Sequence, residues 1–549
     1  MGGLMKRDFQ KLSVFLFVIV SFFIIQSVSA QGKVETRIVY PDPEIQGLAP
    51  KLSLEEYERL LELKEKIHED MLRREQQFAV PAPPGLPLEK GKESKAIELI
   101  DTQTHPLPGS SLVIPRNVYN TCADSTSCGG SNSTLAEPAA INEGLHMFSA
   151  GNFAHAEFSL NGGTSFTNVP IPAGPADASI ACCDNDVVFD RGRGLTIWSL
   201  LYINGAATNG VVRLFIRRTV DTQACSYTID EAGTANNILM DFPHMAVSND
   251  FLYLASNDIV GGATQDARIR RIPLDTIYDC LPITMTNFSW PFTTEGQKVW
   301  RPYQGATETM YWSHISNATT LRIFSWPESA GAPTNVTRVI AASTFGNPDC
   351  SGGTGNFDWF DATAGSSIGF QHVGAVGGGR IAAYWDVAAD AMHTQGHIHS
   401  AVYDETGLTL LAQPHIFNNT FCFGNPNVTT NRRGNLGMIL ALGGNAGGVC
   451  TGSGCLAARP AVGEDDDFTT GLGFFGSFII VANGTDNRSD SRFGDYFTIQ
   501  PHVPCDLFFF AAGYALNGGA GTANVNYRLV DFGRNRDRIC YNSWFNDVR

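Results

Sequence analysis

Three histidines lie close together in the stretch HTQGHIH, at His393, His397 and His399. If this stretch is a β-strand, His397 and His399 share a face, and imidazoles two residues apart can chelate a borderline metal ion. His393 would become a third ligand only if the chain folded back over the turn at Gly396. The alternative is a set of solvated histidines on an edge strand, and the sequence favours that alternative over a metal site.

A run of four acidic residues, from Glu464 to Asp467, could collect a Ca²⁺ ion. The run lacks the alternating D-x-D-x-D-G register in which calcium-binding loops place their oxygen ligands. We therefore interpret it as a solvated loop, with a structural Ca²⁺ as the alternative. No other cofactor is expected.

The chain contains 12 cysteines, all after residue 121. An even number of cysteines in an exported chain favours disulfides over metal sites, and the paired C-x2-C spacing of zinc sites is missing. Two pairs are close enough in sequence to close small loops, Cys122 with Cys128 and Cys450 with Cys455. The adjacent Cys182 and Cys183 are expected to bond to two different partners, and the nearest downstream candidates are Cys225 and Cys280.

Asparagines in N-x-S/T sequons are compatible with an exported surface protein, although several would arise by chance in a chain rich in Asn and Thr. The glycosylation candidates are Asn132, Asn287, Asn317, Asn335, Asn418, Asn427, Asn483 and Asn487.

The elements that would position these residues are short strands in a repeating pattern. Copies of the pattern open near residues 137, 177, 241, 301, 358, 425 and 495, and each continues as two or three alternating or apolar strands. A unit of three or four strands at a period of roughly 40 to 70 residues is what a propeller blade requires, because one small twisted sheet cannot bury both faces until neighbours stack on it. We predict an all-β fold, a seven-bladed β-propeller. Six or eight blades and a different all-β fold are the alternatives.

The openings of these copies are expected to run as the inner strands around the propeller axis. A propeller closes by mixing strands from both ends of the chain, so the stretch Leu112–Pro115 is expected to complete the last blade. The inner strands are expected to open at Asp177, Asp241, Asp358, Asn425 and Asp495.

The stretch Ser159–Phe166, SLNGGTSF, resembles the Asp-box hairpin of sialidase-like propellers, with Asn161 where the Asp usually stands. A short polar side chain caps such a turn through backbone N–H groups while glycines adopt positive φ. The stretch RFGDY at Arg492–Tyr496 and the spacing of Cys505 and Cys540 extend the resemblance to secreted propeller proteins of the sialidase-like superfamily. The resemblance implies that a Cys505–Cys540 disulfide closes the final blade.

True sialidases of this superfamily have an arginine triad that grips a carboxylate, a Tyr activated by a Glu as the nucleophile, and an Asp acid. The family's R-I-P signature precedes the first Asp box, whereas here Arg271-Ile272-Pro273 follows it, so we interpret this match as coincidence. Nothing in the sequence assembles the strand-associated arginines into a triad, and no catalytic residue is assigned. These arginines are Arg213, Arg270, Arg380 and Arg492.

The favoured function is therefore a secreted, non-catalytic propeller that binds a glycan or a cell-surface protein, or that has a structural role at a surface. Five tryptophans could stack on sugars, or could equally be inter-blade packing. They are Trp290, Trp300, Trp312, Trp326 and Trp359. The alternative function is a diverged glycoside hydrolase of the sialidase type, an exo-glycosidase.

Residues 1–30 have basic residues, an apolar core and the sequence Val28-Ser29-Ala30, which together are typical of a secretory signal peptide. Residues 31–80 form an N-terminal segment in which Ser53–Phe78 has the spacing of an amphipathic helix, for packing on the propeller flank or for self-association. Prolines mark a linker at 81–115, and the propeller is expected at 116–549.

The charge of the chain argues against nucleic acid as a partner. The formal net charge is −16 and charged residues make up 17% of the sequence, with no basic patch for a membrane surface. No second apolar run is long enough to span a membrane after signal cleavage. We expect a secreted protein, extracellular or periplasmic.

Overall fold

The computed structural model describes the propeller and three strands that precede it in the chain. The described residues are 32–42, 98–100, 112–120, 137–152, 155–219, 224–230, 238–260, 263–291, 299–343, 350–352, 357–360, 372–444, 456–465, 473–485, 487, 493–519 and 522–547. The predicted signal peptide, the predicted helix at 53–78 and most of the linker lie outside them. So do Cys122, Cys128, Cys450, Cys455, Asn132, Asp466, Asp467 and Arg492.

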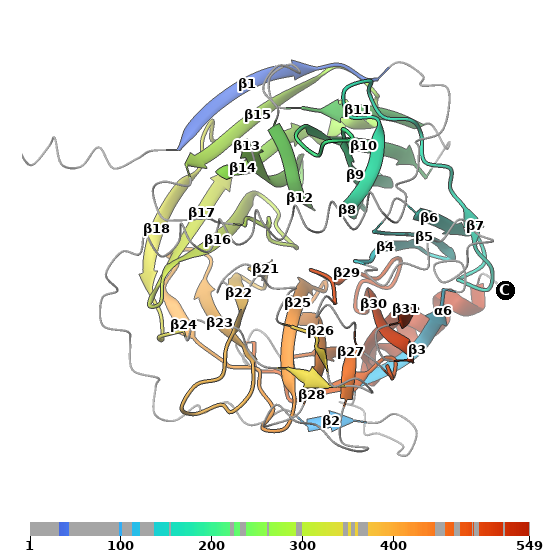
Figure 1. Cartoon of the computed structure of the whole chain (residues 1–549), viewed down its shortest axis with the longest axis vertical. Coiled ribbons are helices and arrows are strands. Elements are labelled where there is room, and N and C mark those ends of the chain that lie inside the picture. Colours follow the sequence, from blue (N-terminus) through green and yellow to red (C-terminus); the bar gives the residue numbers. More distant parts are fainter. Residues whose placement is uncertain are drawn as a thin grey trace, which may run out of the picture.

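Within these residues, seven small sheets surround a central axis, so the predicted seven-bladed propeller is confirmed (Figure 1). Blade 1 contains β4 (Ala139–Glu143), β5 (His146–Gly151), β6 (His155–Ser159) and β7 (Thr167–Asn168). Blade 2 contains β8 (Ile180–Asp190), β9 (Leu195–Ile203), β10 (Gly210–Arg218) and β11 (Ala224–Ile229). Blade 3 contains β12 (Ile238–Val247), β13 (Phe251–Val260), β14 (Ala263–Pro273) and β15 (Ile283–Pro291).

The second half of the ring follows the same plan. Blade 4 contains β16 (Thr309–Asn317), β17 (Thr320–Pro327) and β18 (Thr334–Val339). Blade 5 contains β21 (Val373–Gly377), β22 (Arg380–Val387), β23 (His397–Asp404) and β24 (Leu410–Ala412). Blade 6 contains β25 (Cys422–Thr430), β26 (Leu436–Gly444), β27 (Leu456–Glu464) and β28 (Ser477–Ile480), and blade 7 contains β29 (Thr498–Pro501), β30 (Phe509–Gly519) and β31 (Thr522–Arg534).

The remaining elements lie between or after the blades. They are the short two-stranded sheet of β19 (Ser351–Gly352) and β20 (Phe357–Asp358), the helix α3 (Leu274–Tyr278), the 3-10 helix η2 (Asn535–Asp537) and the helix α6 (Arg538–Asp547).

The inner strands lie close to the positions that the repeat predicted. Asp241 and Asn425 lie in β12 and β25, while Asp177 and Asp495 come just before β8 and β29. The prediction for Asp358 is wrong, because this residue pairs within β20 and the inner strand of blade 5 is β21.

In blade 4, the short segment that contains Tyr303 and Gln304 lies on the axial side of β16, where the other blades have their inner strand. The N–H of Tyr303 donates to the carbonyl of Tyr311 at 2.9 Å, and Gln304 pairs with Ala375 of the next blade. This segment is part of the weak repeat copy that opens at residue 301.

The ring is closed by β3 (Leu112–Tyr119), which pairs antiparallel with β31, so the prediction that this stretch completes the last blade is confirmed. Two earlier strands also join the sheets: β1 (Lys33–Val39) pairs with β15, and β2 (Glu98–Ile100) pairs in parallel with β28. The propeller thus includes strands that lie before the expected boundary at 116. β1 is mostly exposed to solvent and adds to the outer edge of blade 3, where unpaired backbone groups are available to an extended chain.

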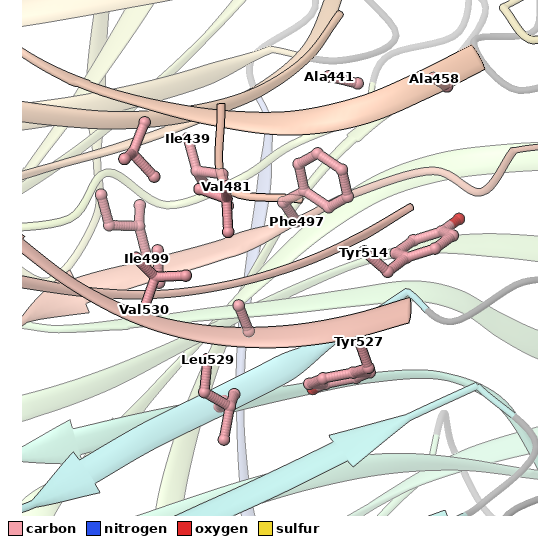
Figure 2. Close-up of a cluster of buried hydrophobic side chains, with 14 of the residues drawn as sticks. Ile439, Ala441, Ala458, Val481, Phe497, Ile499, Tyr514, Tyr527, Leu529 and Val530 are labelled. Carbon is pink, nitrogen blue, oxygen red and sulfur yellow. The ribbon is translucent and has the colours of Figure 1, made fainter. Parts of the chain in front are cut away.

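The interfaces between blades form the core. Figure 2 shows the contact between blades 6 and 7, where Ile439 and Val481 pack against Phe497, Ile499 and neighbouring side chains. Each blade buries both faces in this way, as the repeat required.

The five tryptophans belong to this packing and not to a sugar-binding surface. All five are buried, with exposed fractions of 5% or less. The ring of Trp312 stacks on Phe324 with a centroid distance of 5.1 Å, and Trp300 lies parallel to Phe288 at 5.8 Å. The interpretation of these residues as a sugar platform is wrong, and their interpretation as inter-blade packing is confirmed.

The turn between β6 and β7 has the Asp-box conformation that the sequence predicted. The hydroxyl of Ser159 accepts the N–H of Gly163 at 2.9 Å, and the side-chain oxygen of Asn161 accepts the N–H of Ser165 at 2.9 Å. Gly162 and Gly163 have φ of 68° and 84°, which a side chain would strain. Asn161 therefore caps the turn between β6 and β7 in blade 1.

Four disulfides join described cysteines. Cys505 and Cys540 are bonded as the family resemblance implied, and Cys225 bonds to Cys280. Cys350–Cys422, which the sequence did not predict, links the loop before β19 to β25. The expectation for Cys182 and Cys183 is wrong: they bond to each other at the bulge of β8, where Cys183 has φ of 59°.

The sequons differ in accessibility. Asn335 and Asn483 are exposed, whereas the side chains of Asn287 and Asn487 are buried, at 3% and 1% exposure. A glycan cannot be accommodated at the two buried positions without displacing the strands around them.

The closing seam carries a buried polar network around Asp531 of β31. Its carboxylate accepts from Arg116 Nε at 2.5 Å and from the Tyr541 hydroxyl at 2.6 Å, and His502 Nε2 lies 3.6 Å away. Burial by itself would raise the pKa of Asp531, but Arg116 and His502 hold it well below its usual range. The network joins β3, β31 and α6, which are the elements that meet at the seam.

Replacing Cys505 and Cys540 together with serine should lower the free energy of unfolding by about 3 to 4 kcal/mol, because the bond closes a loop with a sequence separation of 35. Urea denaturation measures the loss, and hydrogen exchange should show faster exchange of the β3 amides. The matched control, serine at Cys225 and Cys280, removes a disulfide away from the seam and should leave β3 protection intact. Unchanged β3 exchange in the first variant would contradict the assignment.

Asp531→Asn should lower the free energy of unfolding at pH 7 by about 3 to 5 kcal/mol, because it leaves Arg116 buried without its partner. Since the folded pKa is depressed, the stabilisation from Asp531 is complete above the unfolded pKa of about 4 and is lost as pH falls below it. Denaturation between pH 6 and pH 3 should therefore show the gap between wild type and variant narrowing on acidification. The exposed Asp275→Asn is the control, and a gap that widens in acid would refute the prediction.

Candidate metal centre and axial cluster

The candidate histidines lie at one end of blade 5, where the hairpin register brings three of them together. β23 begins at His397, so His397 and His399 point to the same face. Beyond β24 the chain returns, and Ile416 exchanges backbone hydrogen bonds with Ile398 at 2.9 and 3.0 Å. This pairing sets His415 against His399, with ring centroids 3.9 Å apart.

A tight turn before β23 adds the fourth histidine. The carboxylate of Asp390 accepts the N–H groups of Met392 and His393, each at 2.7 Å, and the Asp390 N–H donates to the His393 carbonyl at 2.8 Å. The turn folds His393 back so that its ring centroid lies 4.3 Å from that of His397. The fold-back that a three-histidine site required is therefore present.

These histidines are buried, so the expectation of solvated edge-strand side chains is wrong. The exposed fractions of His393, His397, His399 and His415 are 7%, 0%, 2% and 6%. The reason is the returning segment at Ile416, which pairs with Ile398 at the start of β23, so this part of β23 is not an exposed edge.

The spacing of the donor atoms matches that of a metal site. His397 Nε2 lies 3.1 Å from His399 Nε2 and 3.6 Å from an Asp390 carboxylate oxygen. Two ligands on a tetrahedral ion with bonds of about 2.0 to 2.1 Å lie about 3.3 Å apart. Donor atoms of two sets lie within 4.8 Å of one another, His393 with His397 and His415, and Asp390 with His397 and His399. His397 belongs to both sets.

The hydrogen bonds of the rings constrain where their protons are. His397 Nδ1 lies 3.0 Å from the carbonyl of Gln395, an acceptor only, so Nδ1 carries the proton and Nε2 presents a lone pair. This is the arrangement in which a backbone carbonyl orients a metal-binding imidazole. His399 Nδ1 lies 3.2 Å from the Ser343 hydroxyl, which also accepts from Trp385. Either His399 Nε2 donates its own proton to His397 Nε2, or a cation is shared by two lone pairs.

The electrostatics favour the neutral form of the His397, His399 and His415 rings and the charged form of the Asp390 carboxylate. Burial, and then the neighbouring histidines, lower the pKa of His397 to about 3, and burial lowers the pKa of His415 to about 4. The pKa of His399 is lowered well below its ordinary value, mainly by burial. Burial acts to raise the pKa of Asp390, but the backbone N–H groups of His393 and Met392 outweigh it and lower the pKa. Neutral imidazole and ionised carboxylate are the forms that bind metal.

A second polar cluster lies on the propeller axis. The carboxylate of Asp186 in β8 accepts from the N–H groups of Met245 and Val187 at 2.7 and 2.8 Å. Burial raises its pKa to about 7, while those bonds and Arg301 act to lower it. The Arg301 guanidinium lies over the Phe242 ring at 4.7 Å and the Tyr496 ring at 5.6 Å, and burial lowers its pKa to about 10.

The axial cavity beside this cluster is small. Its volume is about 20 Å³, which accommodates one water molecule. Residues that line it include Asp186, His244, Arg301, Gln304, Thr498 and Gln500. A pyranose ring does not fit into this cavity.

Of the arginines singled out from the sequence, the described ones do not converge on this axis. Arg213 binds Asp42 at 3.0 Å on the flank of blade 2, and Arg270 binds Asp258 at 3.3 Å within blade 3. Arg271 donates to the Ala330 carbonyl at 2.8 Å, so the R-I-P match has a structural role. Arg380 begins β22 at the hairpin to β21. The structure assembles no arginine triad from the described residues.

The described part of the acidic run is buried rather than solvated, so the solvated-loop interpretation is wrong for it. Glu464 and Asp465 are 1% and 0% exposed. Asp465 accepts the Leu436 N–H at 2.8 Å, and Glu464 accepts from Asn435 at 3.3 Å. These bonds hold β26 to β27, and calcium binding by the whole run stays a prediction.

Sequence reasoning missed two members of the metal cluster, Asp390 and His415, and the axial Arg301. Asp390 stands three residues before His393, a spacing that a capped turn would have suggested. His415 has no local signal, because its position depends on the register of a later strand. Arg301 opens one of the repeat copies. Its surroundings become visible only in the structure, where inner residues of several blades meet at the axis.

The fold and these two clusters define a seven-bladed β-propeller with a candidate metal centre in blade 5. No protein-family model matches the chain, and no curated protein matches it. Among the described residues, no helix is both long and apolar enough to cross a membrane.

Several solved propeller structures are similar to the chain. An α-L-arabinofuranosidase of Fusarium graminearum is 8% identical, with 76% of this chain and 98% of that one covered and a TM-score of 0.37. The NanB sialidase from Streptococcus pneumoniae is 12% identical, with 74% and 70% covered and a TM-score of 0.35. The Dos1 propeller is 8% identical, with 77% and 95% covered and a TM-score of 0.39. The fold assignment rests on the strand pairing described above.

Proposed function

We propose that this protein is an exported, non-catalytic β-propeller that holds a transition-metal ion of the zinc type at the end of blade 5. The observation that carries the proposal is the approach of His397 Nε2 to His399 Nε2, 3.1 Å apart inside a ring of further donors. The proton on His397 Nδ1 leaves its Nε2 lone pair facing this approach. A metal ion satisfies that lone pair and its neighbours together.

The donor set selects the class of metal. Three or four imidazoles with one carboxylate suit Zn²⁺, Cu²⁺ or Ni²⁺, whereas Ca²⁺ and Mg²⁺ prefer oxygen ligands. Because the four histidines are nearly fully buried and the donors come from three separate segments, the ion would have a structural role. It would join the turn at Asp390, the start of β23 and the segment around His415.

Two observations support the non-catalytic part of the proposal. The axial cavity of about 20 Å³ has no room for a sugar, and the candidate arginines are used in ion pairs and backbone hydrogen bonds elsewhere. Export is supported by the four disulfides and by the apolar run at the start of the chain. A glycan or a surface protein is the proposed partner of the exposed blade loops.

The metal proposal predicts about one Zn²⁺ per chain after treatment with chelator, reloading and dialysis, measured by elemental analysis on residues 31–549. His397→Gln should abolish stable binding, because His397 belongs to both donor sets, while His393→Gln and His415→Gln should weaken it. Binding to the folded state should also raise the melting temperature of the wild type and not of His397→Gln. Co²⁺ should give the visible absorption of a tetrahedral site.

The matched control is His146→Gln, a half-buried histidine of blade 1 beside Phe158, which should bind as the wild type does. Equal zinc content in His397→Gln and wild type would refute the site, as would a wild-type protein that takes up none of Zn²⁺, Cu²⁺, Ni²⁺ or Co²⁺.

The non-catalytic proposal predicts no turnover of fluorogenic sialosides, arabinosides or neutral glycosides by the same protein. A glycan array run beside these assays identifies sugar binding without hydrolysis. Turnover that disappears in Arg301→Met, while the variant stays folded, would overturn the proposal in favour of a hydrolase.

A further inference from the structure

A groove opens on the propeller flank because blades 1 and 2 differ in the length of their outer strands. β6 and β7 have five and two residues, whereas β10 and β11 of the next blade have nine and six. The outer part of blade 2 therefore has no strand of equal length opposite it. Among the described residues, Phe215 and Arg217, which share a face of β10, are therefore only partly buried, whereas Arg213 on the same face is buried.

The groove is a cavity of about 850 Å³, within the range of about 300 to 1,000 Å³ that is usual for small-molecule sites. Its walls include four aromatic side chains. Trp198 lies between Phe148 and Phe215, with ring centroids 5.3 and 5.0 Å from theirs, and Phe158, Pro170 and Pro172 also line the groove. Such walls bind flat apolar rings well, because aromatic faces favour offset or edge contacts with another ring.

The two arginines of the groove differ in their partners. Arg213 is neutralised by Asp42, whose carboxylate also accepts from Ser226 and from the Thr228 N–H. Arg217 lies over the Phe158 ring at 4.6 Å, and among the described residues its guanidinium forms no ion pair. The groove therefore has one cationic group available to a ligand.

Several polar side chains on the walls are already engaged. The Thr196 hydroxyl donates to Glu143, and Ser226 is held between Arg213 and Asp42. A sugar needs many hydrogen bonds when it leaves water, and besides Arg217 it would find the exposed side chains of Thr167 and Asn168 as partners. A flat ring with one charged group needs only the aromatic walls and Arg217.

We propose that this groove binds an aromatic carboxylate, with its ring against the side chains of Phe215, Trp198 and Phe158 and its carboxylate on the Arg217 guanidinium. Guanidinium groups bind carboxylates through two parallel N–H···O bonds, which fixes the direction of the ligand. The site lies on the flank between blades 1 and 2, away from the axis and from the metal cluster of blade 5 (Figure 1).

Titration calorimetry with 2-naphthoate on residues 31–549 tests the proposal, with 2-naphthamide as the uncharged ring and glucuronate as the charged sugar. We expect 2-naphthoate to bind at least tenfold more tightly than either. Arg217→Gln should weaken it about tenfold, the loss expected for one hydrogen-bonded charged group, and Arg217→Lys should weaken it less. The matched control is Arg322→Gln, because Arg322 also lies over an aromatic ring, Trp290 at 5.2 Å, on another blade.

Thermal melting confirms that each variant is folded before binding is compared. Equal binding of 2-naphthoate by Arg217→Gln and wild type would overturn the proposal. So would equal affinity for 2-naphthamide, preference for glucuronate, or no binding of 2-naphthoate at millimolar concentration.

Discussion

The pairing of β3 with β31 is the contact on which the whole ring depends. Every other pair of neighbouring blades is consecutive in the chain, but blades 7 and 1 come from opposite ends of the propeller sequence, and a strand from the N-terminal side completes blade 7. The buried ion pair of Arg116 with Asp531 and the Cys505–Cys540 bond lie at this contact. Covalent and ionic restraints thus coincide with the place where a closed ring of sheets would first open.

The two polar clusters illustrate different ways of burying charge. On the axis, Arg301 and Asp186 face each other across inner strands, and backbone N–H groups and aromatic rings supply the remaining contacts. In blade 5, buried imidazoles face one another, with His397 Nε2 and His399 Nε2 3.1 Å apart. The first cluster joins one buried cation to carboxylates, and the second brings neutral imidazoles and one carboxylate to one place.

The fold could be predicted because blade formation is a local property. Alternation of apolar residues, turn residues and the spacing of the copies identified β4, β8, β12, β25 and β29 or their immediate approaches. Features that depend on register between distant segments could not be predicted in this way. The bond between Cys182 and Cys183 follows from a bulge in β8, and the burial of Glu464 follows from its contact with Arg534 of blade 7.

The same limit applies to the sites. The spacing of His397 and His399 predicted a shared face, but whether that face was wet or dry depended on the return of the chain at Ile416. Tryptophan is equally suited to stacking on sugars and to filling a wedge between blades, and composition does not distinguish the two. The sequence therefore indicated which residues were candidates for binding, and the packing of the sheets determined which of them are buried.

The three N-terminal strands also constrain when the protein can fold. β1, β2 and β3 leave the ribosome first, yet they pair with residues 283–289, 477–479 and 528–534, which are made much later. These early strands have no native partner during most of synthesis, and closing such distant pairs is slow. The ring can become complete only after the last blade has emerged.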